Sequence, residues 1–239
     1  MREDDSPIDT TTLQRVGGAL GSHPAGIYED ARGRRWYVKT VESPAHARNE
    51  WLAAQLYRLA GAPTLPYRRS RVPDQVVTAW VPLRCHRVSQ LSEAERCQAR
   101  HWLGVHAWLA NWDAAGFDGD NQGVGPDGTV LTLDVGGALL YRAQGDPKGA
   151  AFGTRVDEWD RLRCDPDNPH ARRLFADMDA AELRAAAQGV TALPAAMVQA
   201  CVLRHGGTPA LAQQLLARQA DLRLRAGPGS PGTAAPGPT

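Results

Sequence analysis

The chain has 239 residues, which allows one substantial hydrophobic core or a small lobe joined to a larger one. Its 27 Lys and Arg residues are balanced by 26 Asp and Glu residues, so no overall basic character would attract nucleic acid or anionic lipid. The four cysteines form no close pair, which argues against a disulfide framework or a zinc site. No apolar run approaches the length of a membrane span.

The two ends of the chain differ in composition from the part between them. Residues 1–12 are polar and acidic, unlike a Sec signal peptide, and we expect them to form a flexible leader. Residues 226–239 are rich in Gly, Pro, Ala and Ser, which predicts a disordered tail.

Lysine is nearly absent from this chain. Only Lys39 and Lys148 occur among the 27 cationic residues, and the rest are arginine. The chain therefore uses lysine almost nowhere for plain solubility. Each of the two invites a chemical explanation, with chance as the alternative.

Residues 13–41 predict a small antiparallel sheet that contains the first candidate site. A glycine-rich bend over Gly17–Gly26, which includes Gly21 and Ser22, leads to a strand over Arg35–Thr40. Glycines in such a bend let backbone N–H groups approach phosphate oxygens. A lysine near the end of the strand, Lys39, lies where it can contact phosphates, although an edge-strand lysine that points to water would show the same pattern.

A helix is predicted from Ser43, its capping residue, to about Ala60, with Gly61 as its stop. Glu50 lies near its middle and can turn toward Lys39 to form an ion pair, or it can be a solvated glutamate.

A connection with a basic cluster follows the helix: Arg68, Arg69 and Arg71. A β-type run from Gln75 to Val81 then leads to Val81–Leu83, which we expect to form a hinge whose backbone meets an adenine.

The next segment predicts one helix from Ser92 to Ala110, which begins with a capping box completed by Glu95. His101 and His106 are five residues apart, which does not suit a helical metal pair, so we interpret both as structural.

The segment 111–137 contains most of the candidate chemistry. Asp113 is followed by Asn121, then by a predicted hairpin, and then by Asp134 before Val-Gly-Gly. In phosphoryl transfer one carboxylate orients the attacking hydroxyl, while an Asn and a second Asp hold Mg²⁺. A tight hairpin would set the separation of Asn121 and Asp134, although a surface hairpin with polar ends is the alternative.

The remaining chain predicts a short loop and then a helical lobe. Arg142 and Lys148, in the loop after Asp134, would meet a substrate or a phosphate, or they would decorate the loop surface. From residue 156 onward, helix start and stop signals and regularly spaced leucines predict helices that serve as scaffold. The predicted division is an N-lobe over residues 13–83 and a C-lobe over residues 84–225.

The order of these parts resembles the protein-kinase-like superfamily. Within it, the chain is similar to the atypical branch of phosphoinositide 3/4-kinases, HipA-type toxins and minimal kinases among bacterial type III effectors. The segment Asn111-Trp112-Asp113, Asp120-Asn121 and Asp134-Val135-Gly136 looks most like that of type II phosphatidylinositol 4-kinases. The resemblance covers roughly residues 15–150.

The resemblance implies a two-lobed α+β fold, with ATP and Mg²⁺ as cofactors. The roles that it implies are nucleotide contacts for Gly21, Ser22 and Val81, phosphate contact for Lys39, a pairing role for Glu50, catalysis by Asp113, and Mg²⁺ binding by Asn121 and Asp134. The spacing from Asp113 to Asn121 is longer than in the usual catalytic loop, so Asp118 or Asp120 is an alternative base.

The function that we expect is ATP- and Mg²⁺-dependent phosphorylation of a protein by a bacterial effector- or toxin-type kinase. The alternatives are a phosphoinositide or small-molecule kinase, and a non-catalytic pseudokinase module. The expected location is the bacterial cytoplasm, or a target cell reached without a Sec signal peptide. No nucleic-acid partner and no transmembrane segment are expected.

Overall fold

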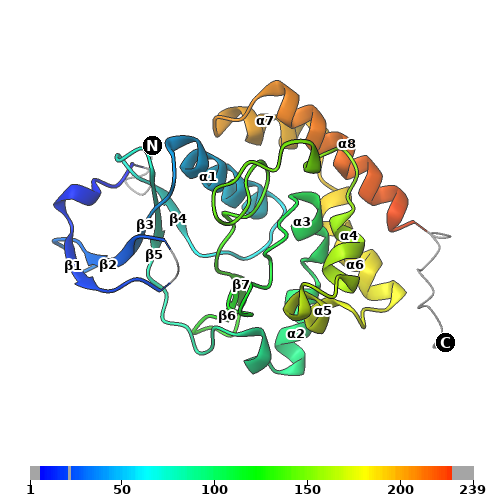
Figure 1. Cartoon of the computed structure of the whole chain (residues 1–239), viewed down its shortest axis with the longest axis horizontal. Coiled ribbons are helices and arrows are strands. Elements are labelled where there is room, and N and C mark those ends of the chain that lie inside the picture. The colour runs from blue at the N-terminus through cyan, green and yellow to red at the C-terminus, as the bar shows by residue number, and fades with distance from the viewer. Residues whose placement is uncertain (1–5, 21–22, 228–239) are drawn as a thin grey trace.

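The computed structural model describes residues 6–20 and 23–227, which form two lobes (Figure 1). The N-lobe is an antiparallel sheet in the order β1-β2-β3-β5-β4 with one helix, α1, against it. Its elements are β1 (Gln14–Gly17), β2 (Ala25–Glu29), β3 (Arg35–Thr40), α1 (Pro44–Leu59), β4 (Tyr67–Arg69) and β5 (Gln75–Ala79). The α+β, two-lobed architecture predicted from the sequence is confirmed.

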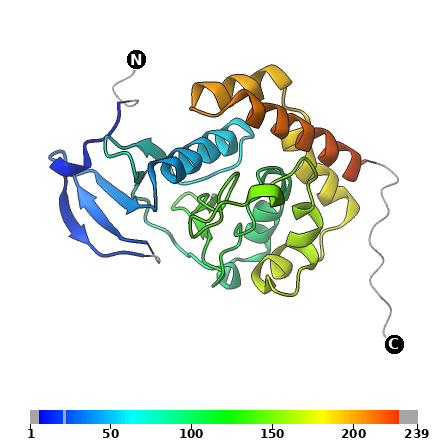
Figure 2. The ribbon, with the colours of Figure 1, turned by 45° about the horizontal axis from the view of Figure 1, so that its top comes forward.

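The C-lobe is mostly helical and contains one short hairpin. Its longer elements are α2 (Glu93–Arg100), α3 (Leu103–Trp108), β6 (Gln122–Val124), β7 (Val130–Thr132), α4 (Glu158–Cys164), α5 (Pro169–Phe175), α6 (Ala180–Thr191), α7 (Ala195–Arg204) and α8 (Pro209–Arg225). Three short 3₁₀ helices in the described chain are η2 (Thr10–Thr12), η3 (Val88–Gln90) and η4 (Gly149–Ala151). Figure 2 shows α1 between the sheet and the C-lobe, with α7 packed beside it.

Residues 6–12 lie against the sheet, although we expected a flexible leader over residues 1–12. The Ile8 N–H donates to the Arg69 carbonyl at 2.7 Å, and the Arg71 N–H donates to the Ile8 carbonyl at 2.8 Å. These bonds pair backbone groups that the edge strand β4 would otherwise leave open. Residues 1–5, and all of the expected tail except Ala226 and Gly227, lie outside the described residues.

Helix α1 begins and ends where the sequence predicts. The Ser43 side chain accepts a hydrogen bond from the His46 N–H, and Pro44 is the first helical residue. At the other end Gly61 has φ +79°, a left-handed conformation that glycine adopts without strain.

The single helix predicted from Ser92 to Ala110 is wrong in one respect: the chain breaks at His101 and Trp102 into α2 and α3. The capping box of Ser92 and Glu95 is present at the start of α2. All residues of α3 are buried, whereas Ala99 is the buried residue of α2. Because a continuous straight helix cannot be half exposed and half fully enclosed along this path, the break directs the second half into the core.

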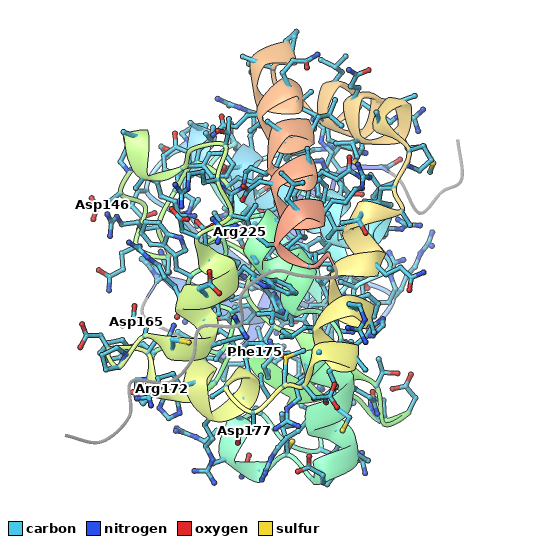
Figure 3. All side chains as sticks on the ribbon, turned by 90° about the vertical axis from the view of Figure 1, so that its right-hand side faces the viewer. Asp146, Asp165, Arg172, Phe175, Asp177 and Arg225 are labelled. Atoms are coloured by element: carbon cyan, nitrogen blue, oxygen red, sulfur yellow. The ribbon has the colours of Figure 1, made fainter. Side chains whose placement is uncertain are left out.

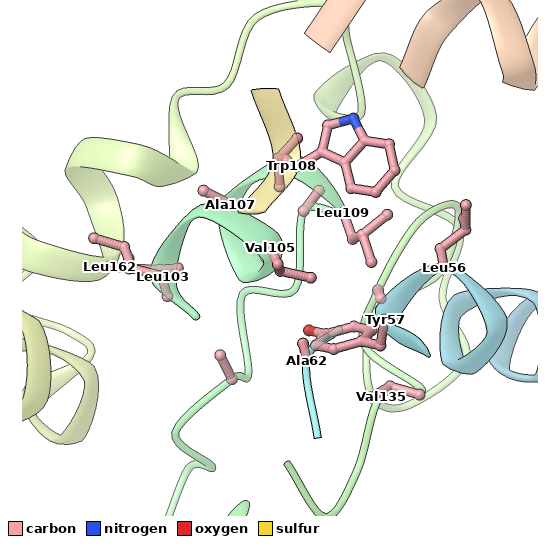
Figure 4. Close-up of a cluster of buried hydrophobic side chains, with 14 of the residues drawn as sticks. Leu56, Tyr57, Ala62, Leu103, Val105, Ala107, Trp108, Leu109, Val135 and Leu162 are labelled. Atoms are coloured by element: carbon pink, nitrogen blue, oxygen red, sulfur yellow. The ribbon is translucent and has the colours of Figure 1, made fainter. Parts of the chain in front are cut away.

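The main core lies directly beneath the junction of the lobes (Figure 4). It brings Tyr57 of α1 together with Val105 and Trp108 of α3 and with Val135, which follows Asp134. The helix that leads to Asn111 is therefore packed against the helix that presents Glu50.

Arg218 of α8 is fully buried and fixes the end of α3. Its guanidinium donates to the carbonyls of Ala107 and Trp108 at 2.8 and 2.7 Å and to the Glu158 carboxylate at 2.7 Å. The terminal carbonyls of α3, which lack partners in their own helix, are satisfied in this way.

In the part of the chain that the structure describes, no single helix has the length and apolar composition of a membrane span.

Candidate active site

Lys39 lies at the centre of the candidate site, between two carboxylates from different elements. Its Nζ is 3.0 Å from Glu50 Oε2 on α1 and 3.0 Å from Asp134 Oδ2 after β7. The predicted ion pair between Lys39 and Glu50 is thus present, and the two alternatives, a lysine and a glutamate in solvent, are excluded because both residues are buried. This triad joins the sheet, α1 and the C-lobe hairpin.

The electrostatics of the triad keep Lys39 charged. Burial opposes the charge, but the carboxylates of Asp134 and Glu50 outweigh it and hold the pKa of Lys39 above its usual range. Burial also raises the pKa of Asp134, but Lys39 and the Gly136 N–H, which donates to Asp134 Oδ1 at 2.7 Å, leave that pKa below its usual value. Asp134 is therefore held as a carboxylate.

Asp113 and Asn121 meet beside the triad. Asn121 Nδ2 donates to Asp113 Oδ2 at 3.0 Å and to the Asp113 carbonyl at 2.7 Å. Burial, followed by the negative charge of Asp134, raises the pKa of Asp113 to about 7. A carboxylate with that pKa is suited to accept a proton near neutral pH.

Asn111 holds the start of this loop in place. Its Oδ1 accepts from the Asp113 N–H at 3.3 Å, and its Nδ2 donates to the Tyr57 hydroxyl at 2.9 Å. That hydroxyl lies 2.8 Å from His106 Nδ1, and burial lowers the pKa of His106 to about 3, so the ring is neutral. The structural role predicted for His106 is confirmed.

The long spacing between Asp113 and Asn121 is accommodated by a compact turn. Gly116 and Gly119 have φ +84° and +72°, and a Cβ on Gly116 would overlap the Asp120 carboxylate. The turn returns the chain so that Asn121 reaches Asp113. Asp118 lies exposed at the tip of this turn, so Asp113 rather than Asp118 is the carboxylate that contacts Asn121.

The predicted hairpin places Asn121 next to Asp134. β6 and β7 pair antiparallel with Gly123 opposite Leu131, and the Leu133 N–H donates to the Asn121 carbonyl at 3.0 Å. Asn121 and Asp134 therefore leave the hairpin side by side, as the sequence predicts.

The ligand types at this position suit Mg²⁺. Asn121 Oδ1 accepts no hydrogen bond from the residues that the structure describes, and Asp134 supplies carboxylate oxygens. No group of three or more His, Cys, Asp or Glu residues gathers within the described ranges. Magnesium commonly takes one or two protein oxygens and completes its shell with phosphates and water, so Asn121 and Asp134 fit such an ion.

The predicted nucleotide contacts are only partly described. Gly21 and Ser22 lie outside the described residues, although the flanking Leu20 N–H donates to the Tyr37 hydroxyl of β3 at 3.1 Å. Val81 follows β5 in the segment that joins the lobes. Its backbone makes no hydrogen bond within residues 6–20 and 23–227, so both its groups remain free for a ligand.

Lys148 has neither of the roles that the sequence analysis considered. It is buried, and its Nζ donates to the carbonyls of Ala110, Gly137 and Leu139 at 2.7, 2.7 and 3.0 Å. Ala110 and Leu139 have φ +51° and +58°, and they are the non-glycine residues with positive φ in the described chain. Lys148 therefore ties the loop before Asp113 to the loop after Asp134 at two strained positions.

Tyr67 is a site residue that the sequence analysis missed. Its hydroxyl donates to Glu50 Oε1 at 3.2 Å and accepts from the Val135 N–H at 3.4 Å. It lies on β4, next to the basic cluster, and no pattern in the sequence distinguishes it from an ordinary strand tyrosine.

No protein-family model matches the sequence, and no curated protein matches it significantly. Among solved structures, the Helicobacter pylori proinflammatory kinase CtkA superposes with a TM-score of 0.60 at 11% identity, over 92% of this chain and 98% of that one. An aminoglycoside phosphotransferase from Alicyclobacillus acidocaldarius (TM-score 0.32, 14% identity, 94% and 98% of the two chains) and the macrolide 2'-phosphotransferase MphH from Brachybacterium faecium (0.35, 13%, 87% and 82%) match much less closely. The similarity to CtkA shows that this chain has a kinase-like fold.

Proposed function

We propose that this chain is an ATP- and Mg²⁺-dependent phosphotransferase that acts on hydroxyl groups of a protein. The observation that carries the proposal is the convergence of Lys39, Glu50 and Asp134, with both Lys39 distances at 3.0 Å, beside the pair formed by Asp113 and Asn121. A scaffold that only binds a partner has no need for a buried cation between two carboxylates, which is costly to desolvate.

Each residue of the site has a role in this reaction. Lys39, held by Glu50, positions the nucleotide phosphates, and Asn121 and Asp134 hold the metal. Mg²⁺ bridges the phosphates and offsets the charge that develops during transfer. Asp113 orients the acceptor hydroxyl and accepts its proton, and its contact with Asn121 keeps its carboxylate next to the metal position.

The surroundings of Asp113 support a protein as the acceptor. Phe117, at the tip of the turn between Asp113 and Asn121, is 88% exposed, and the loop from Asp134 to Lys148 is short. No inserted element of the described chain follows Asp134 to enclose a small acceptor. An open surface with an exposed aromatic beside the reacting position suits an extended segment of another protein.

Transfer from radiolabelled ATP into cell lysate tests this proposal, with the products separated into protein, lipid and small-molecule fractions. We expect label in the protein fraction, and we expect Asp134→Ala to abolish it. Asp177→Ala is the matched control, since Asp177 is exposed between α5 and α6 (Figure 3). Label found only in lipid would replace the protein acceptor by a phosphoinositide.

A thermal-shift measurement separates an enzyme from a binding module that has lost its nucleotide. ATP with Mg²⁺ at about 100 times its Kd should stabilise the chain by about 2.7 kcal/mol. No shift for the wild type, together with no transfer, would refute the proposed function.

A further inference from the structure

A basic groove lies on the N-lobe side of the molecule, away from the Lys39 triad. It is a cavity of about 410 Å³ between α1, the segment from β4 to β5 and the end of α7. Its lining contains five arginines and no Asp or Glu: Arg48, Arg68, Arg69, Arg71 and Arg204. In a chain with 27 cationic and 26 anionic residues, such a concentration of one charge predicts an anionic ligand.

Three of these arginines come from three different elements and are uncommitted. Arg48 of α1, Arg69 of β4 and Arg204 of α7 are exposed, and none has an ion pair or hydrogen bond through its side chain to another described residue. By contrast, Arg71 pairs with Asp9 at 3.2 Å, and Arg68 donates to the Ser6 carbonyl at 3.2 Å. The three uncommitted guanidinium groups are therefore available to one ligand.

We propose that this groove binds a phosphorylated peptide segment. Guanidinium groups present planar forks that match phosphate oxygens, and clusters of arginine are a common means of recognising phosphopeptides. The volume exceeds what one phosphate needs and leaves room for neighbouring peptide atoms against Trp51 and Pro73. The peptide as carrier rests on the proposed function, because a protein kinase produces such segments.

The groove is connected to the candidate active site through two of its own walls. Tyr67 lines the groove, and its hydroxyl donates to Glu50 at 3.2 Å. Arg48 and Trp51 line it from α1, the helix that presents Glu50 to Lys39. A ligand that bridges Arg48 and Arg204 would hold α1 against α7, and it would thereby favour the ion pair that positions the nucleotide.

Fluorescence anisotropy with a labelled alanine heptapeptide that carries two phosphoserines tests the site on the full chain. We expect the phosphopeptide to bind and its unphosphorylated form not to bind. The double variant Arg69→Ala/Arg204→Ala should raise the Kd about tenfold or more. The control variant Arg172→Ala/Arg173→Ala removes the same charge from exposed positions on α5 and should change the Kd by less than about twofold.

Four results would overturn the proposal: no binding of the phosphopeptide, equal binding of the unphosphorylated peptide, an equal loss in the control variant, or complete displacement by ATP with Mg²⁺. Vesicles with phosphatidylinositol 4,5-bisphosphate form a further arm, and binding to these alone would replace the peptide by a membrane. Because peptide binding needs no catalysis, a chain that binds the peptide but transfers no phosphate would refute the proposed function and leave the groove intact.

The coupling has its own readout. Saturating phosphopeptide should tighten ATP binding about fivefold or more, and Tyr67→Phe should remove this effect while it retains peptide binding. Unchanged ATP affinity in the presence of bound peptide would refute the coupling.

Discussion

Replacement of Lys148 by methionine should separate the positioning of the active-site loops from the stability of the fold. The Lys148 ammonium group donates to three carbonyls, at 2.7, 2.7 and 3.0 Å, in the loops on either side of Asp113 and Asp134. Methionine has a similar length and no charge, so it fills the same space and makes none of these bonds. The loops are then held only by their own strained backbone.

The expected loss of stability is small because two large terms oppose each other. Burial, modified by the charges of Glu158, Arg218 and Arg142, lowers the pKa of Lys148 from 10.5 to about 7. This corresponds to a cost of roughly 5 kcal/mol for the charged form. Three hydrogen bonds from a charged donor return about 4.5 to 9 kcal/mol. We therefore expect Lys148→Met to lower the free energy of unfolding at pH 7 by no more than about 4 kcal/mol.

The expected loss of activity is larger. A displacement of about 1 Å at reacting groups can cost about 100-fold in rate, so kcat should fall by about that factor while KM for ATP changes little. Urea unfolding and the transfer assay measure the two effects on the same samples. Full activity in the folded variant would refute the positioning role, and so would a loss that only follows the unfolded fraction.

The pH dependence of stability gives an independent check on Lys148. Between pH 7 and 10.5 the unfolded chain binds a proton that the folded chain has released, so this group makes the chain more stable as the pH rises. The slope is about 1.4 kcal/mol for each pH unit and should be absent in Lys148→Met. Identical slopes for the two proteins from pH 7 to 9 would contradict the lowered pKa.

Three further predictions concern the site and its support. Lys39→Met should lower transfer by about 100-fold or more, since it removes the phosphate contact, and the transfer assay checks this. Asp113→Asn should keep ATP binding, measured by thermal shift, but lose turnover. In the wild type the rate should rise with pH through about 7, where Asp113 becomes deprotonated, and excess Mg²⁺, which offsets the charge of Asp134, should move this rise to lower pH. Gly104→Ala should lower the free energy of unfolding by about 3 kcal/mol in urea, because the added Cβ would overlap the backbone carbonyl of Ala186.

Each of these has a contrasting result. Activity in Asp113→Asn together with inactivity in Asp120→Asn would reassign the base. A rate that does not change with pH near 7 would contradict the raised pKa of Asp113. Gly189→Ala is the matched control for Gly104→Ala, because its Cβ would make only ordinary contacts at 3.9 Å, and it should be neutral or stabilising by up to about 1 kcal/mol. A wild-type level of transfer in Lys39→Met would refute the phosphate role.

The parts of the site that could be predicted are those with local signals. A hairpin of fixed length determines the separation of Asn121 and Asp134, and a capped helix places Glu50 within reach of Lys39. The role of Lys148 could not be predicted, because its partners are backbone carbonyls, which leave no mark in the sequence, and one of them, Ala110, is 38 residues away.

The fold was predicted in outline, and its differences arise from tertiary packing. The segment 92–110 has a continuous helical pattern, yet the core encloses only its second half, so the chain breaks at Trp102. Residues 6–12 look like a polar leader, but the open edge of β4 gives Ile8 a backbone partner at Arg69. Both outcomes depend on which surfaces the rest of the chain leaves open, and a single segment does not contain that information.

The two lysines of this chain are both buried, with exposures of 9% for Lys39 and 4% for Lys148. Reagents that acylate or cross-link exposed amines therefore find no accessible lysine side chain, and attachment of ubiquitin to lysine would first require local unfolding. A nucleotide that carries an acyl phosphate is different, because it would deliver its reactive group to the amine that contacts the phosphates. Such a probe should label the chain at one position, Lys39, against almost no background from the surface.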